Sequence, residues 1–509
     1  MNRAAHLFQQ AEQRPGKTAL ISGERKISFE VLAEDVRKMA RHLANAGVQQ
    51  GDRVGAMVPN SLEFIVIQQA IFALGAVFTP INIYFRHHEL EHLITSCCLN
   101  VLILPSDLVA RFHPIRPRKP DSLRTVLTLD EEWSQLAEKP LSDEPFTLAE
   151  VRPDDVVLVL STSATNGKSK GVPLTASNLA ANYDRTPDWL GLTVEDVIFC
   201  ALPLYNTFGL NQCINAALLT GATLVLETRF DANRAAEAIC KHKCTFLPAV
   251  PTMLQKLLDD PATKEWQLPS LRLVMTGGAP VPAALLRRLQ LFTGGRTRVV
   301  TGYGLTEATA LVTLDEVELD ENGDVRRGGT IGRVLDGMDL AILDAENRAV
   351  KANDIGEICI RGPNVMSGYL DSPEDTAVAL SGGWLHTGDL GTIDDNGFVT
   401  IVDRIKDVII RGGQNIYPGE IEEVLYFFAG VAEAAVVGRT HDVLGEVPVA
   451  YVAAAPGIVL DISGLADLCR QKLAPYKLPA EIRVMPDLPK GPTGKILRRM
   501  VRAKFERAA

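Results

Sequence analysis

The chain lacks the features that mark three large classes of protein. Residues 1–16 are polar and mixed, so no secretory signal is predicted. The most apolar stretch, residues 64–83, is interrupted by Gln68 and Gln69 and contains Gly75 and Pro80, so no membrane span is predicted either. Lysine and arginine number 52 against 62 aspartates and glutamates, and a net charge of −10 is not the basic footprint of a nucleic-acid-binding protein. The eight cysteines are too scattered for a disulfide scaffold. We therefore predict a cytoplasmic protein with no membrane span and no nucleic-acid partner.

What the chain does have is the alternation of strands and helices typical of layered α/β folds. With 509 residues it is too long for one hydrophobic core. Strand-like and helix-like segments alternate from residue 18 to residue 300, and Ser28 and Ser61 are placed to cap helices. The fold class we predict is α/β.

The last two hundred residues differ in composition from the rest. Residues 315–400 are rich in Gly, Asp and Asn, which favours a β-rich subdomain with many turns. About a hundred residues then remain, with their own strands and helices. We predict a large N-terminal domain over residues 1–403, made of layered α/β subdomains plus this β-rich part. A small, mobile α+β C-terminal domain should cover residues 404–509.

A polar loop follows one of the strongest predicted strands. The sequence STSATNGKSKG at 161–171 comes directly after the apolar run Val156–Leu160 and combines hydroxyls, lysines and glycines. Such a loop can surround phosphates with N–H and O–H donors. It is not the phosphate loop of kinases and ATPases, because that motif requires Gly where Thr162 stands.

Three more predicted strands end in polar or glycine-rich turns, at residues 203–206, 276–280 and 301–307. Ligands of α/β sheets bind beyond the carboxyl ends of strands, so we expect these turns to converge on one site.

The motifs together identify a family. STSATNGKSKG, GYGLTE at 302–307, WLHTGDL at 384–390, DRIKDVIIRGGQNIYPGEIE at 403–422 and PKGPTGKILRR at 489–499 occur in that order. This pattern resembles that of the acyl-adenylate-forming enzymes, which include acyl-CoA synthetases, adenylation domains of peptide synthetases and firefly luciferase. The resemblance covers nearly the whole chain and is strongest to acyl-CoA synthetases.

The resemblance implies a two-step reaction and assigns roles to residues. A carboxylate attacks the α-phosphate of ATP to give acyl-AMP and pyrophosphate, and a thiol then displaces AMP. Lys495, Thr306 and Glu307 are the implied catalytic residues, with Glu307 also holding Mg²⁺, a hard cation that prefers oxygen ligands. Lys495 would bridge the substrate carboxylate and the α-phosphate, and Lys406 would be the hinge of the C-terminal domain.

Further residues are implied in binding. Tyr303 would stack on adenine, whereas Asp389 and Arg404 would meet the ribose. The full cofactor-binding set is Thr162, Ser163, Thr165, Asn166, Gly167, Lys168, Gly278, Ala279, Gly302, Tyr303, Gly304, Asp389, Arg404, Gly412 and Gly413. Gly412 and Gly413 would line the approach of the thiol. The set implied for the acyl substrate is Tyr205, Asn206, Gly209, Gly277 and Thr301, with Gly278, Ala279 and Gly302 beside it.

The chain departs from the family pattern at four positions. The phosphate loop of the family usually has Gly at the position of Ala164, Thr or Ser at that of Asn166, and Pro at that of Ser169. Acyl-CoA synthetases commonly have His at the position of Asn206. These departures bear on rate and substrate choice.

The leading hypothesis is an ATP-dependent acyl-CoA synthetase that uses ATP, Mg²⁺ and CoA. Gly302 stands where malonate-activating relatives carry an arginine, so we expect a monocarboxylic acid with an apolar body, either medium-chain or aryl. Two alternatives stay open: a ligase that loads the phosphopantetheine of an acyl carrier protein, and a nucleotide-binding homologue with impaired catalysis. The oligomeric state is open, with a homodimer as one option.

Overall fold

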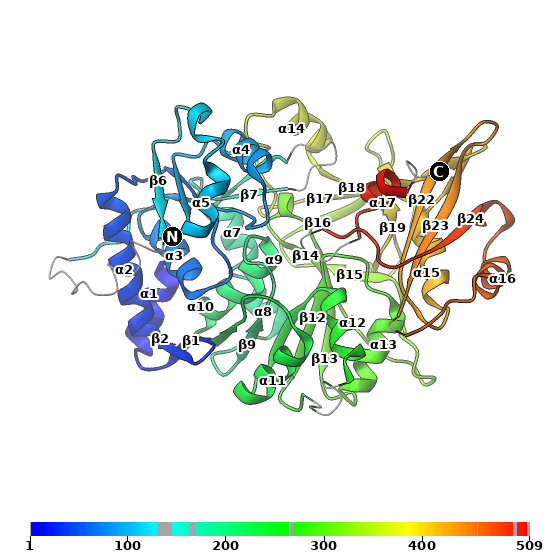
Figure 1. Cartoon of the computed structure of the whole chain (residues 1–509), viewed down its shortest axis with the longest axis horizontal. Coiled ribbons are helices and arrows are strands. Elements are labelled where there is room, and N and C mark those ends of the chain that lie inside the picture. Colours follow the sequence, from blue (N-terminus) through cyan, green and yellow to red (C-terminus); the bar gives the residue numbers. More distant parts are fainter. Residues whose placement is uncertain are drawn as a thin grey trace.

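The computed structural model describes residues 2–129, 145–162, 169–261, 263, 266, 268–455, 457–491 and 496–505, except for the side chains of 504 and 505. A large body carries the N-terminus, and a smaller one at the opposite end carries the C-terminus (Figure 1). None of the described helices is long and apolar enough to cross a membrane.

The first sheet has six strands in the order β6-β5-β3-β4-β7-β8. All neighbouring pairs are parallel except β7 and β8, which form an antiparallel pair. The strands are β3 (Arg53–Ala56), β4 (Val77–Pro80), β5 (Val101–Leu104), β6 (Thr125–Thr128), β7 (Val156–Ser161) and β8 (Gly171–Thr175). The accompanying helices are α1 (Ala5–Gln13), α2 (Phe29–Asn45), α3 (Leu62–Ala73), α4 (His87–Ser96), α5 (Ser106–Phe112) and η1 (Arg116–Arg118).

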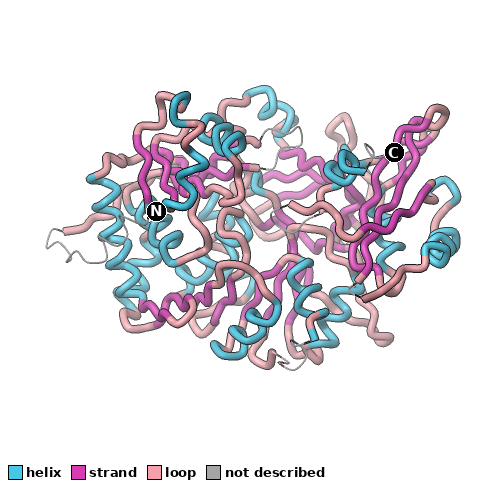
Figure 2. The backbone as a smooth tube through the Cα atoms, viewed as in Figure 1, coloured by secondary structure: helices cyan, strands magenta, loops and turns pink. Residues whose placement is uncertain are grey.

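The second sheet has thirteen strands and joins the α/β part to the β-rich part, in the order β16-β17-β18-β19-β15-β14-β13-β12-β11-β9-β10-β1-β2. Its parallel portion is formed by β1 (Thr18–Ser22), β9 (Val197–Cys200), β10 (Thr223–Leu226), β11 (Phe246–Ala249), β12 (Leu273–Gly277) and β13 (Arg298–Gly304), with β2 (Arg25–Ser28) at the edge. The antiparallel portion is β14 (Leu311–Glu316), β15 (Thr330–Val334), β16 (Asp339–Leu343), β17 (Gly356–Arg361), β18 (Leu385–Ile393) and β19 (Val399–Arg404). The strands cross the middle of the molecule in Figure 2.

Helices separate the parallel strands. They are α7 (Ala176–Asn182), α8 (Thr186–Leu190), α9 (Thr207–Gly209), the π-helical turn η2 (Leu210–Asn215), α10 (Ala216–Thr220), α11 (Ala232–His242), α12 (Pro251–Asp259) and α13 (Ala283–Phe292). The β-rich part adds η4 (Thr306–Ala308), α14 (Pro373–Ala379) and η5 (Ser381–Gly383).

The smaller body is built on a separate five-stranded sheet. Its elements are η6 (Ile405–Asp407), β20 (Ile409–Arg411), β21 (Gln414–Ile416), α15 (Pro418–Tyr426), β22 (Val431–His441), β23 (Gly445–Ala454), α16 (Ile462–Lys472), η7 (Pro475–Lys477), β24 (Glu481–Met485) and α17 (Arg498–Phe505). Alternate residues of β22 face two different apolar clusters: Ala434 and Val436 pack with α15 and α16, whereas Ala435 and Val437 pack with Leu488.

Local signals in the sequence explain where several elements begin. Ser28 Oγ accepts a hydrogen bond from Val31 N at 3.3 Å, and Ser61 Oγ accepts one from Phe64 N at 3.3 Å, so both predicted caps are confirmed. Helix α3 is buried on almost every side, as expected for an apolar helix that polar residues interrupt only briefly. The predicted class, α/β with a large N-terminal and a small C-terminal domain, is confirmed. The boundary near residue 403 remains a proposal, supported by the new sheet that begins after β19.

Candidate active site

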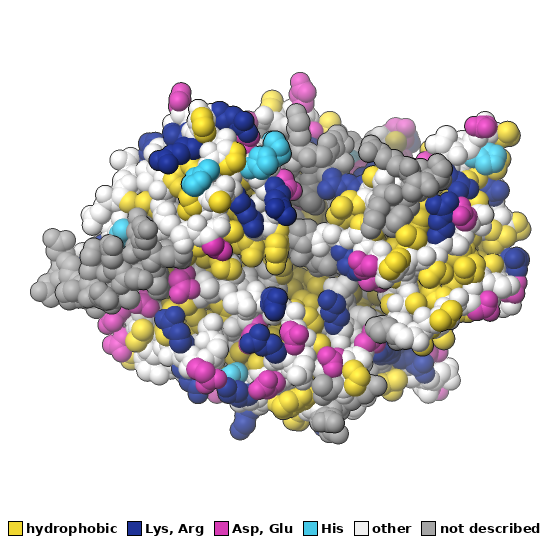
Figure 3. Space-filling view, viewed as in Figure 1, with side chains coloured by type: hydrophobic (Ala, Val, Ile, Leu, Met, Phe, Trp, Pro, Cys, Tyr) yellow, Lys and Arg dark blue, Asp and Glu magenta, His cyan; other side chains and the backbone are white. Residues whose placement is uncertain are grey.

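The turns after β9, β12 and β13 line one cleft. Pro203, Tyr205, Asn206 and residues 277–280 and 301–307 border it, together with segments of the small domain such as 426–431 and 496–499. The expected convergence of strand ends is therefore found, because β9, β11, β12 and β13 are neighbouring parallel strands. Lys, Arg, Asp and Glu side chains are interspersed on the face of the molecule shown in Figure 3.

Asp389 is held at the cleft by two donors. Tyr303 Oη donates to its Oδ2 at 2.7 Å, and Arg404 Nε lies 2.8 Å from its Oδ1. Asp389 and Arg404 are register partners on β18 and β19, so strand pairing brings the ion pair together. Asp389 is 5% exposed, and each of its oxygens can accept a further bond. The carboxylate is thus fixed in direction and still able to accept two adjacent hydroxyls.

Tyr303 has a contact that the motif did not predict. Its hydroxyl is committed to Asp389, whereas the resemblance predicted only stacking of its ring on adenine. Burial, followed by the negative charge of Asp389, holds the pKa of Tyr303 well above its usual range. The hydroxyl therefore stays protonated and serves as a permanent donor to the carboxylate.

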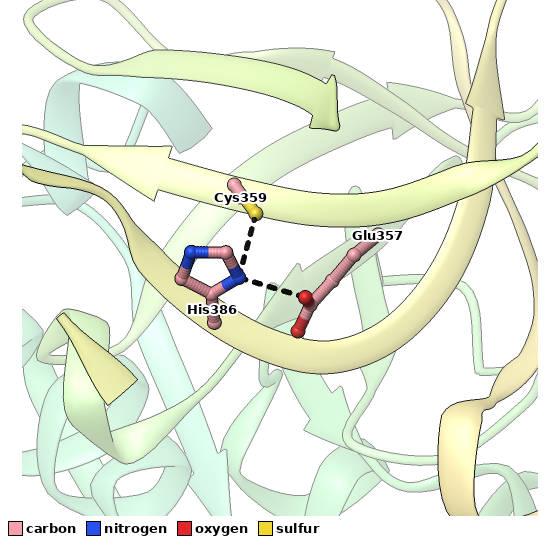
Figure 4. Close-up of side chains that lie close together, drawn as sticks. All are labelled: Glu357, Cys359 and His386. Carbon is pink, nitrogen blue, oxygen red and sulfur yellow. Dashed lines mark hydrogen bonds and ion pairs between the residues drawn. The ribbon is translucent and has the colours of Figure 1, made fainter. Parts of the chain in front are cut away.

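A cluster on β17 and β18 fixes the turn that carries Asp389 (Figure 4). His386 Nδ1 lies 2.7 Å from Glu357 Oε2 and 3.5 Å from Cys359 Sγ, while Gly388 N donates to Glu357 Oε1 at 2.8 Å. Gly388 has φ +72°, a left-handed conformation that favours glycine, and the strand register shifts at this point. Glu357 therefore holds both sides of the irregular turn from which Asp389 projects.

The same cluster has ligand types that metals accept, and it is the one such group found among the described residues. Its atoms are already used: Glu357 accepts from His386 and Gly388, and the other ring nitrogen of His386 lies 3.2 Å from Ser381 O. Burial, followed by the charge of Glu357, raises the pKa of Cys359 to about 12, whereas a metal-binding cysteine is a thiolate. We interpret the cluster as a hydrogen-bonded support for Asp389.

A Glu357→Gln variant tests this support. Glutamine can accept one of the two hydrogen bonds, but its NH₂ group cannot accept the other. We expect KM for ATP to rise roughly tenfold, because a hydrogen bond to a charged group contributes about 1.5 kcal/mol or more. KM for the carboxylic acid should stay within about twofold in steady-state assays. Glu346→Gln, in the exposed turn after β16, is the matched control. Equal changes in both KM values would mean that Glu357 only stabilises the fold.

Glu307 begins a chain of contacts toward the predicted phosphate loop. Tyr369 Oη donates to Glu307 Oε1 at 2.9 Å, and Lys170 Nζ lies 4.7 Å from the centre of the Tyr369 ring. Lys170 also pairs with Asp375 at 2.7 Å. Among the described residues, the second carboxylate oxygen of Glu307 has no hydrogen-bond partner, so it fits the oxygen ligand that Mg²⁺ prefers. Neither Tyr369 nor Asp375 lies in a recognised motif, which is why sequence reasoning missed them.

Several predicted residues lie outside the described part of the chain. They are Ser163, Thr165, Asn166, Gly167, Lys168 and Lys495, together with Ala164. The described residues beside them do border the cleft: Thr162 and Ser169 on one side, and Gly491 and Ile496 on the other. Thr162 N donates to Lys170 O at 3.0 Å, which continues the β7–β8 pairing to the last described residue of the stem.

Glycines at the substrate side are closely packed, against backbone at Gly277 and Gly209 and against side chains at Gly302. A Cβ at Gly277 would lie 2.3 Å from Gly302 O, and one at Gly209 would lie 2.6 Å from Pro203 O. A Cβ at Gly302 would lie 2.6 Å from Met275 Cε. All predicted acyl-site residues line the cleft: Tyr205, Asn206, Gly209, Gly277, Gly278, Ala279, Thr301 and Gly302. Gly304 and Thr306 line it too.

The small domain is tied to the end of β19. Arg498 contacts Asp403 at 2.5 Å, Asp407 at 3.1 Å and Glu422 at 2.8 Å, and these carboxylates raise its pKa above the usual range in spite of burial. Asp403 precedes the predicted hinge residue Lys406, whereas Arg498 follows it by some ninety residues. The contact therefore holds the small domain in its present orientation.

Gly412 and Gly413 are not at the cleft. Both are exposed and absent from its lining in this orientation of the small domain. Their predicted contact with the thiol would require the small domain to turn.

Comparisons with known proteins agree with this architecture. The model of the AMP-binding enzyme family matches residues 7–370, and that of the AMP-binding enzyme C-terminal domain matches residues 420–495. A feruloyl-CoA synthase from Amycolatopsis sp is 34% identical over 98% of both chains. A CoA ligase from Mycobacterium tuberculosis is 37% identical over 98% of both chains. Its name describes a propanoyl group that bears a methyl-dioxo-octahydro-indenyl ring system.

Comparison with solved structures shows which known domain orientation the chain resembles. The ATP-bound crystal structure of MatB from Rhodopseudomonas palustris matches with a TM-score of 0.90, at 31% identity over 99% of both chains. The apo structure of the same protein matches with a TM-score of 0.80 at the same identity and coverage. The present arrangement is thus closer to that of the ATP-bound form. The chain belongs to the AMP-binding enzyme family, the acyl-adenylate-forming superfamily, and lies near its acyl-CoA synthetases, which are AMP-forming acid–CoA ligases.

Proposed function

We propose that this acid–CoA ligase activates a monocarboxylic acid with a largely apolar body, medium-chain or aryl, and transfers it to CoA. The observation that carries the proposal is the single cleft that joins the turns after β9, β12 and β13 to Asp389 and to the residues beside Lys495. A nucleotide and an acid bound there would meet between the two domains.

The first step joins the acid to AMP. A carboxylate oxygen attacks the α-phosphorus of ATP, and the bond from that phosphorus to the pyrophosphate oxygen breaks. Asp389, fixed by Tyr303 and Arg404, accepts the ribose hydroxyls. Glu307 would hold the Mg²⁺ that accompanies ATP and so offset phosphate charge. Lys495 reduces the repulsion between the two reacting anions.

The second step forms the thioester. The sulfur of CoA attacks the acyl carbon, AMP leaves with its phosphate oxygen, and the thiol proton is lost. In the present orientation Gly412 and Gly413 are away from the cleft, so we propose that rotation at Lys406 brings them to it. This rotation would break the contact of Arg498 with Asp403.

The substrate class rests on the absence of cations in the three turns. Residues 203–206, 277–280 and 301–306 contain no lysine or arginine, so a second carboxylate on the substrate finds no partner there. The relatives act on varied acids: the names of two carry a dioxo-indenyl propanoyl and a feruloyl group, and a Bacillus subtilis relative is a long-chain-fatty-acid–CoA ligase. The largely apolar acyl groups of these three relatives support an apolar body, whereas the single carboxylate rests on the turns alone.

A substrate panel tests the proposal. Pyrophosphate and AMP release are measured with medium-chain, aryl and dicarboxylic acids, each with CoA, with a phosphopantetheinylated carrier protein, or with neither. We expect acid-dependent AMP release that requires CoA and favours monocarboxylates by about a hundredfold over dicarboxylates of similar length, because burying an unpaired charge is costly. Faster transfer to the carrier protein than to CoA would mean that the carrier protein, and not CoA, is the acyl acceptor. No turnover with any acid would contradict the proposed function.

A further inference from the structure

The segment after β9 contains an unusual helix. Thr207–Gly209 begins as α9, and Leu210–Asn215 continues as the π-helical turn η2. π-helical turns are rare and occur frequently at functional sites, because they change the direction in which side chains project. Here the turn carries Gln212, which borders the active-site cleft, as do Tyr205 and Phe208.

Three other polar side chains in or next to this helical segment are hydrogen-bonded within the protein. Asn211 Nδ2 donates to Thr186 Oγ1 at 2.9 Å, and Asn215 Nδ2 donates to Tyr183 O at 2.7 Å. Thr207 Oγ1 donates to Thr309 O at 2.5 Å. These three polar groups are thus satisfied within the fold, as most buried polar groups are.

Tyr205 and Gln212 are exceptions, and both line the cleft. The hydroxyl oxygen of Tyr205 and Oε1 of Gln212 are buried without a hydrogen-bond partner in the described part of the chain. Gln212 is only 1% exposed. Phenylalanine at 205 and methionine at 212 would fill similar space without the cost of unpaired polar groups. Among the described residues with a buried, unpartnered side-chain atom, these two are the ones that line the cleft, so a ligand bound there is the partner that we consider for them.

Residues 205–212 contribute no charged side chain to the wall of the cleft, and apolar side chains line the same cleft. Phe208, Met275 and Leu311 line the same cleft, and the side chains of Met275 and Leu311 close around Gly302. No lysine or arginine occurs between Tyr205 and Gln212. An uncharged oxygen group fits such a wall, whereas a second carboxylate does not.

We propose that Tyr205 and Gln212 recognise a hydroxyl or keto oxygen on the body of the acid substrate. This inference rests on the proposed function and narrows its substrate class to oxygen-bearing monocarboxylates. The Tyr205 hydroxyl can donate to either group, and the amide of Gln212 offers both a donor and an acceptor. A substrate without the oxygen would leave both groups unpaired, and sites of this kind reject such analogues more strongly than apolar pockets reject a missing methylene.

The test compares matched pairs of acids. kcat/KM is measured for para-hydroxyphenylpropanoate against phenylpropanoate, and for an oxo-octanoate against octanoate, at saturating ATP and CoA. We expect the oxygenated member of at least one pair to be preferred by on the order of tenfold to a hundredfold. The pair that shows the preference reveals whether the site recognises a phenolic hydroxyl or a ketone on an aliphatic chain.

Two variants connect the preference to these residues. Tyr205→Phe and Gln212→Met should bring the ratio toward one, chiefly by lowering kcat/KM for the oxygenated acid. Tyr205→Phe should also leave thermal stability unchanged or higher, because it removes an unpaired hydroxyl. The matched control is Tyr183→Phe, because Tyr183 is buried and is not among the residues that line the cleft; it should not change the ratio.

The outcomes separate this inference from the proposed function. If plain acids are used as well as or better than the oxygenated acids in every pair, the inference is wrong, although acid-dependent AMP release still supports the ligase. If both variants keep the wild-type ratio, recognition lies elsewhere. If no acid supports AMP release, the proposed function itself fails, and the inference with it.

Discussion

A Lys495→Ala variant is expected to form acyl-AMP about two to three orders of magnitude more slowly than the wild-type enzyme. The attacking carboxylate and the α-phosphate are both anionic, and one well-placed cation in a site that excludes water contributes roughly 3–4 kcal/mol to such a step. Lys495 is the only lysine between Lys490 and Lys504, and Lys490 is already paired with Glu433 at 2.7 Å. No neighbouring lysine can therefore replace it.

The measurement separates the two half-reactions. Single-turnover formation of acyl-AMP is compared with formation of acyl-CoA from supplied acyl-AMP and CoA. The variant should keep the second rate within about threefold, since no phosphate is attacked in that step. Lys472→Ala, an exposed lysine on α16 of the same domain, is the matched control and should match wild type in both steps. An equal loss in both steps would contradict the role assigned to Lys495.

Asp389→Asn should lower kcat/KM for ATP by about a hundredfold. The variant keeps the shape of the side chain but places an NH₂ group or a neutral oxygen opposite Arg404 Nε, which can only donate. It also removes the charge that strengthens hydrogen bonds from the ribose, and hydrogen bonds to charged groups contribute roughly 1.5–3 kcal/mol each. The acid does not contact Asp389 in this account, so KM for the acid should change little.

ATP titrations at saturating acid and CoA provide the measurement. The control is Asp395→Asn, in the exposed turn that follows β18. A thermal unfolding midpoint close to that of the wild type would show that the loss comes from the site and not from the fold. An unchanged kcat/KM for ATP would mean that Asp389 does not bind the ribose.

Features set by local sequence were predictable. The caps at Ser28 and Ser61, the apolar strands and the order of motifs depend on residues close together in the chain, and the structure agrees with them. The convergence of three turns was predictable as well, because parallel strands bring their carboxyl ends to one edge.

Features that depend on long-range pairing were not predictable. The contact of Glu357 with His386 and Gly388 requires the register of β17 on β18, and the contact of Lys170 with Asp375 joins residues far apart in sequence. Gln212 gave no signal, because a π-helical turn differs from an α-helix by one extra residue that no pattern of apolar positions reveals. The tight packing of Gly277 on Gly302 likewise follows from the β12–β13 pairing.

The central claim is that the cleft between the domains forms an acyl-adenylate before any thiol takes part. The most direct measurement is the exchange of labelled pyrophosphate into ATP, with the acid present and CoA absent. The account predicts exchange that depends on the acid, requires Mg²⁺ and falls to background in the Lys495→Ala variant. Exchange without any acid, or AMP formation that occurs with no exchange under any condition, would contradict it.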